Sequence, residues 1–139
     1  MPLKVDFMDG GRGVTFLAFG HLTGSDLIRA VSEVETAKKA ASNVLYVFFD
    51  FNGVIGVDIT TFQLHQLAGI SVSASTRSIK GRVVAIHAKD DLPFALTRMW
   101  MVFVQESGWE TALFRERAPA VAWVKRRVSD KFGLTVHPD

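Results

Sequence analysis

A nearly continuous apolar run at residues 44–51 constrains the fold of this chain more than any other feature. Its sequence, VLYVFFDF, is rich in β-branched and aromatic side chains, which favour strands over helices. A strand with one face in water would alternate apolar and polar residues, whereas this run is apolar on both faces. We therefore expect a central strand in a sheet that is covered on both sides.

Predicted strands and helices alternate around this run. The expected elements are a hairpin of strands at 3–7 and 14–19, a helix from 24 to about 41, the strand at 44–51, a turn, a helix at 60–73, a strand at 82–88, a helix at 90–105, a strand at 109–115 and a helix from 119. The order β-β-α-β-α-β-α-β-α predicts an α/β fold, with a mixed, mostly parallel sheet flanked by helices. We expect one domain over residues 1–139, with no linker.

Composition argues against several classes of protein. The chain has no cysteine, which excludes disulfides, thiolate nucleophiles and cysteine-ligated metal sites. Lys and Arg exceed Asp and Glu by only 16 to 14, so we expect no nucleic-acid partner. The apolar runs are too short to span a bilayer, and the first residues lack the features of a signal peptide. We expect a cytoplasmic protein without membrane insertion.

No catalytic or metal-binding pattern is visible among the ionisable residues. The four histidines lie in separate segments and lack the spacing of metal ligands, so we expect no metal or other cofactor. An enzyme would require His21, His87 and an acid to converge in one cleft. We therefore expect a protein that is not an enzyme.

Two segments, 44–62 and 113–124, resemble a known family. Together with the element order, they resemble STAS-type proteins, and in particular the SpoIIAA-like (STAS/SEC14-like) branch. The second segment, LFRERAPAVAWV, is similar to that branch in having a phenylalanine, Phe114, followed several residues later by the alanine-tryptophan pair Ala122 and Trp123. The resemblance implies a STAS-like fold over most of the chain.

The resemblance also implies a regulatory site at the start of the helix at 60–73. In anti-sigma-factor antagonists of the STAS family, a strand-end aspartate leads through a turn to a helix start whose second serine is phosphorylated by a partner kinase. The resemblance places Asp50 at the strand end and Thr60 at the phosphorylated position. It implies a regulatory domain that binds a protein partner or itself. The expected contact surface consists of Asn52, Gly53, Asp58 and Thr61.

Two interpretations of Thr60 stay open. A phosphate there would face unpaired backbone N–H groups and the positive end of the helix dipole. Thr60 and Gln63 also match a capping box, and Ile59 with Leu64 matches a hydrophobic staple. Thr60 is therefore either a phosphorylation switch or a helix cap.

The predicted helix at 90–105 is apolar almost all the way round, although a helix that lies on a sheet needs only one apolar stripe. Met99, Trp100 and Phe103 could form a surface for a second copy, a protein partner or a small apolar ligand. The alternative is a helix buried within its own domain. Our second functional hypothesis is a carrier or sensor that binds a lipid-like ligand in an apolar pocket between this helix and the sheet, as the resemblance to the SEC14-like branch suggests.

Overall fold

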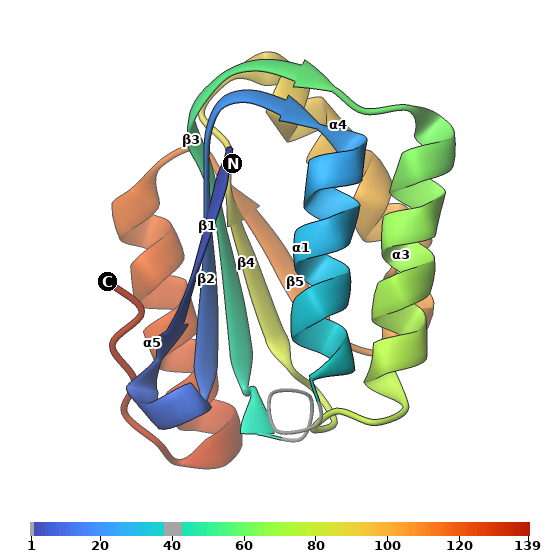
Figure 1. Cartoon of the computed structure of the whole chain (residues 1–139). Coiled ribbons are helices and arrows are strands. Elements are labelled where there is room, and N and C mark those ends of the chain that lie inside the picture. Colours follow the sequence, from blue (N-terminus) through green and yellow to red (C-terminus); the bar gives the residue numbers. More distant parts are fainter. Residues whose placement is uncertain (1, 38–42) are drawn as a thin grey trace.

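A five-stranded sheet lies at the centre of the protein, whose computed structural model describes residues 2–37 and 43–139 (Figure 1). The strands are β1 (Leu3–Met8), β2 (Gly13–Thr23), β3 (Tyr46–Asp58), β4 (Val83–His87) and β5 (Glu110–Phe114). The helices are α1 (Gly24–Thr36), α3 (Thr61–Ser75), α4 (Asp91–Phe103) and α5 (Arg117–Phe132). The order β-β-α-β-α-β-α-β-α is confirmed.

The strands lie side by side in the order of the sequence. β1 pairs antiparallel with β2, which confirms the predicted hairpin. The pairs β2–β3, β3–β4 and β4–β5 are all parallel, so the sheet is mixed and mostly parallel. β3 lies at its centre, as the apolar run at 44–51 predicted.

Helices cover both faces of the sheet: α1, α3 and α4 lie on one side and α5 lies on the other (Figure 1). Val47 of β3 packs in an apolar cluster that includes Val31 of α1. The next residue, Phe48, belongs to the opposite cluster, which includes Val124 of α5. Successive side chains of a strand point to opposite faces, so burial on both sides explains the unbroken apolar run.

The predicted turn after residue 51 is wrong, because β3 continues as a strand to Asp58. β4 stops where His87 pairs with Asp50, whereas β3 remains paired with β2 up to the pair of Asp58 with Thr23. The two strands thus extend beyond the rest of the sheet. We call residues 20–23 and 52–58 the two-stranded ribbon; it curves toward the first turns of α1 and α3 (Figure 1).

Glycines that indicated a turn instead permit close approach of the two strands in this ribbon. A Cβ atom at Gly53 would lie 3.1 Å from the carbonyl oxygen of Ala18. A Cβ atom at Gly56 would lie 2.7 Å from Nδ1 of His21. Glycine inside a strand often marks such an approach. The same residues that favour turns in sequence therefore belong to a strand here.

For α1, the observed start agrees with the prediction from the sequence better than the observed end does. The side chain of Thr23 accepts a hydrogen bond from the N–H of Asp26, as the predicted N-cap requires. α1 ends at Thr36, earlier than the expected end near residue 41, and residues 38–42 lie outside the described part of the chain. In the described ranges, every helix is too short or too polar to cross a membrane.

Candidate functional site

An apolar pocket lies between the sheet and the helices α1, α3 and α4, next to the two-stranded ribbon. Its volume is about 60 Å³, several times the roughly 10–15 Å³ that a single water molecule requires. The lining residues are Leu22, Leu27, Val31, Phe49, Phe51, Val57, Ile59, Leu64, Leu67, Ser71, Ile86, Pro93, Leu96, Thr97 and Trp100. Sequence reasoning proposed a pocket between α4 and the sheet, and a pocket lies there.

Aromatic side chains form much of one wall. Phe49 stacks on Phe16 with ring centroids 4.6 Å apart and on Phe51 at 5.9 Å. Trp100 of α4 meets the Phe49 ring edge-on at 6.4 Å. Such rings are large and stiff, and stacked and edge-on pairs hold them in place. The wall is therefore formed by residues that cannot easily collapse to fill the space.

The pocket offers few polar atoms. Of the two hydroxyl side chains among its described lining residues, Thr97 donates its hydrogen bond to the carbonyl oxygen of Pro93 at 2.7 Å. The other, Ser71, is only 4% exposed. A cavity with apolar walls binds water poorly, because a buried water molecule needs two to four polar partners. The arrangement favours an apolar guest over a hydrated one.

α4 divides its apolar residues between this pocket and the surface. Trp100 lines the pocket, and Phe103 stacks on His65 of α3 with ring centroids 3.8 Å apart. Met99 is 38% exposed and Val102 is 61% exposed. The helix is therefore neither fully buried nor placed wholly on the surface, and Trp100 alone of the three residues singled out in the sequence lines the pocket.

At the start of α3, Thr60 forms the predicted capping box. Its Oγ1 accepts a hydrogen bond from the N–H of Gln63 at 3.1 Å, and its own N–H donates to Oε1 of Gln63 at 2.9 Å. The other residues expected in the contact surface are also exposed: Asn52 and Gly53 lie where the ribbon begins, Asp58 lies where it ends, and Thr61 opens the helix. Capping accounts for the position and the hydrogen bonds of Thr60.

On the opposite face of the sheet, a polar cluster joins Asp50, His87 and Arg117. Oδ1 of Asp50 lies 3.1 Å from Nδ1 of His87 and accepts the N–H of Asn52 at 2.9 Å. Oδ2 accepts a hydrogen bond from Arg117 at 2.6 Å. Among the described residues, no hydrogen bond or ion pair joins His21 to this cluster, and none of the cluster's members lines the apolar pocket. Of the two histidines singled out in the sequence, His87 is therefore the one that contacts an acid, Asp50.

Sequence reasoning missed a buried ion pair near the starts of β3 and β4. Arg82 is fully buried, and its Nη1 donates to both carboxylate oxygens of Glu35, at 2.8 and 3.0 Å. Its guanidinium group lies over the Trp109 ring, 4.5 Å from the centroid. A charged residue at the start of the strand predicted at 82–88 was the available signal, but the partner on α1 lies far away in sequence.

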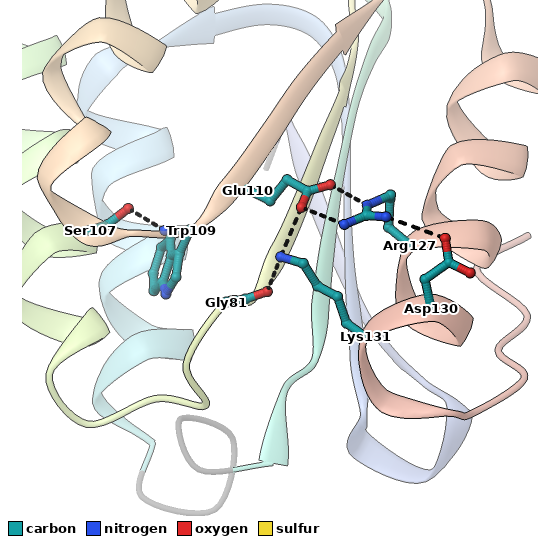
Figure 2. A network of polar contacts seen from close by, with 7 residues as sticks. All are labelled: Gly81, Ser107, Trp109, Glu110, Arg127, Asp130 and Lys131. Atoms are coloured by element: carbon teal, nitrogen blue, oxygen red, sulfur yellow. Dashed lines mark hydrogen bonds and ion pairs between the residues drawn. The ribbon is translucent and has the colours of Figure 1, made fainter.

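A second ionic network joins β5 to α5 (Figure 2). Arg127 donates to both carboxylate oxygens of Glu110, and Lys131 lies 2.8 Å from one of them. Lys131 also donates to the carbonyl oxygen of Gly81. The hydrogen bond from Arg127 lowers the pKa of Glu110, and the same bond raises the pKa of Arg127. These contacts hold α5 against the edge of the sheet and face away from the pocket.

The fold and the pocket together define an α/β domain with an apolar cavity beside an extension of its sheet. Comparison of the chain with models of protein families, with curated proteins and with solved structures found no significant match. The structure itself therefore carries the functional argument.

Proposed function

We propose that this protein is a non-enzymatic binding domain that holds a small apolar, lipid-like ligand in the pocket next to α4, as a carrier or sensor. The single observation that supports the proposal is the cavity of about 60 Å³ with almost entirely apolar walls. Close packing normally leaves few voids larger than a water molecule in a protein interior. A cavity of this size at the end of a parallel sheet is a usual place for a ligand.

The size of the cavity indicates what would fit. It is smaller than the engineered cavity of about 150 Å³ that accepts benzene. The space suits the end of an alkyl chain, and half-buried lining residues such as Phe51, Ile59 and Leu96 leave one side open for the rest of the ligand. Each methylene group that enters would gain about 0.8 kcal/mol by leaving water.

Two substitutions on α4 test this function. Leu96 lines the pocket, whereas Leu92, on the same helix, is 55% exposed. Leu96→Trp fills the pocket and should abolish binding of 1-pentanol, measured by NMR titration, while Leu92→Trp should leave binding unchanged. Native mass spectrometry of protein from its natural source should also detect a small apolar molecule. Equal affinity of the wild type, Leu96→Trp and Leu92→Trp for 1-pentanol would contradict the proposal.

A second candidate function is regulatory binding of a protein partner, as the resemblance to STAS-type proteins implies. It is favoured by large apolar side chains exposed at the end of the molecule where the ribbon lies. Ile55 in the ribbon is 89% exposed, and Phe62 in the first turn of α3 is 71% exposed. Scattered apolar residues are normal on surfaces, but these two flank the capped helix start at Thr60.

This second function is tested with Ile55→Asp and Thr60→Glu in pull-down experiments from the native source. A partner that binds at this surface should be lost with Ile55→Asp and kept with Val102→Asp, which changes an equally apolar residue on α4 that is 61% exposed. Phosphorylation predicts a mass increase on the native protein and a changed affinity of Thr60→Glu. If the native mass shows no phosphate and Thr60→Glu binds as the wild type does, Thr60 is a cap only.

A further inference from the structure

Ser71 of α3 is a buried residue whose hydroxyl group lies at the apolar pocket and has no partner among the described side chains and backbone groups. The residue is 4% exposed, and its side chain forms no hydrogen bond with any described residue. In a helix, a serine hydroxyl commonly donates to the carbonyl group one turn earlier, as Thr97 does in α4. A hydroxyl without a partner costs free energy wherever water is kept away from it, so its position in an apolar pocket is a reason to look for a partner outside the chain.

The hydroxyl of Ser71 is accessible from the apolar pocket. Among the described residues, no side-chain nitrogen or oxygen is both sealed from the surroundings and without a hydrogen bond. The Ser71 oxygen has no partner, so it must be reachable, and the residue lines the apolar pocket. The Thr97 hydroxyl already donates a hydrogen bond to the carbonyl oxygen of Pro93, and Trp100 is only partly buried. Ser71 is therefore the deeply buried donor that a guest would meet.

A second, smaller cavity is also lined by Ser71. Its volume is about 20 Å³, enough for roughly one water-sized group. The two cavities share four lining residues: Val31, Phe49, Ser71 and Trp100. The smaller cavity also reaches the buried pair of Glu35 and Arg82. The lining therefore becomes more polar from the apolar pocket, past Ser71, toward a charged pair.

From this gradient we propose that the ligand is an apolar chain with one polar atom at its buried end, and that Ser71 hydrogen-bonds that atom. The ligand enters with its oxygen first and its hydrocarbon end toward the mouth. This inference rests on the proposed ligand-binding function and specifies its ligand as an alcohol-like or carbonyl-bearing chain rather than a pure hydrocarbon. A purely apolar guest would leave the hydroxyl of Ser71 unpaired.

The test compares two probes that differ in one polar group, 1-pentanol and 1-pentene, by NMR titration of the whole protein in sealed tubes. Ser71→Ala should weaken binding of 1-pentanol about fivefold and change binding of 1-pentene less than twofold. Ser73→Ala is the matched control, because Ser73 lies on the same helix but is exposed. It should change neither affinity. Equal effects of Ser71→Ala on both probes, or no effect on either, would overturn the inference.

Orientation gives an independent readout in the wild-type protein. The protons beside the hydroxyl of bound 1-pentanol should show nuclear Overhauser effects to the β-protons of Ser71, and the terminal methyl group should show none. The reverse pattern overturns the inference while leaving the proposed function intact. If the wild type binds neither probe, the proposed function fails and the inference fails with it. Because this measurement uses the wild-type protein, it tests the orientation of the ligand even if Ser71→Ala does not fold.

Discussion

At the scale of single residues, Thr60 is a side chain that suggests function in the sequence but caps a helix in the structure. It is the residue that the resemblance placed at a phosphorylated position, and it forms both hydrogen bonds of a capping box with Gln63. Two of the N–H groups at the start of α3 are thereby satisfied. Any role in signalling would have to compete with this structural one.

Thr60→Ala should lower the free energy of unfolding by about 1 kcal/mol, because it removes the acceptor for the N–H of Gln63. Thr60→Ser keeps a hydroxyl group at the same place, so it should lower the free energy of unfolding by only a few tenths of that amount. Urea unfolding of the three proteins at pH 7 measures both effects. Equal stability of all three would show that the cap contributes nothing.

Gly13 is required because a neighbouring ring occupies the space beside it. A Cβ atom at this position would overlap the Tyr46 ring, which is fully buried and donates a hydrogen bond to Asp9. Gly13→Ala should therefore destabilise the protein by about 1–3 kcal/mol or more. Gly69→Ala is the control, because Gly69 lies in α3 with open space around it. That change should stabilise by about 0.5–1 kcal/mol, and thermal unfolding compares the two.

At the scale of elements, charged side chains attach helices to the sheet. Glu110 joins the edge strand β5 to Arg127 and Lys131 on α5 (Figure 2). Glu35 joins α1 to Arg82 at the start of β4. The first network is partly exposed and the second is buried, so the two respond differently to pH and to mutation.

The network at Glu110 predicts a pH-dependent contribution to stability. Its pKa in the folded protein lies below the ordinary value of 4.5, mainly because Arg127 hydrogen-bonds the carboxylate. A lowered folded pKa contributes stability that is present above the unfolded pKa and is lost as the pH falls through the folded pKa. The stability difference between wild type and Glu110→Gln should therefore be larger at pH 7 than at pH 3. A difference that does not depend on pH would contradict this account.

Arg82→Met should destabilise the protein by about 3–5 kcal/mol, because it leaves the buried carboxylate of Glu35 without its partner. The double variant with Glu35→Leu should recover most of that loss, since two apolar side chains can replace a buried ion pair. Denaturant unfolding of both variants measures the recovery. If the double variant is no more stable than Arg82→Met, packing around the guanidinium group matters more than charge pairing.

At the scale of the whole molecule, the sequence predicted the layers correctly and the end of the sheet incorrectly. Residues 44–51 predicted a strand covered on both faces, because a strand buried on both sides has a nearly continuous apolar sequence. The ribbon was not predicted, because Asn52, Gly53 and Gly56 are typical turn residues. Only cross-strand neighbours explain the two glycines. The apolar helix at 90–105 and the family resemblance anticipated a pocket, but the cavity beside Ser71 and the ion pair of Arg82 arise only through tertiary packing.

Hydrogen exchange should distinguish the ribbon from the rest of β3. Residues 46–50 pair with strands on both sides, whereas residues 52–58 pair with β2 alone. A two-stranded segment is less protected than the interior of a sheet. Backbone amides at 52–58 should therefore exchange faster than those at 46–50, measured residue by residue by NMR. Equal protection would show that the ribbon is as stable as the central sheet.

The ribbon also links two helices mechanically. Thr23 and Asp58 are paired at its end, and α1 starts one residue after the first while α3 starts a few residues after the second. A guest that pushes the ribbon outward would shift the first turns of both helices in the same direction. Occupancy of an interior cavity would then change the shape of the outer surface around Thr60, so that a molecule binding at that surface could sense whether the cavity is filled.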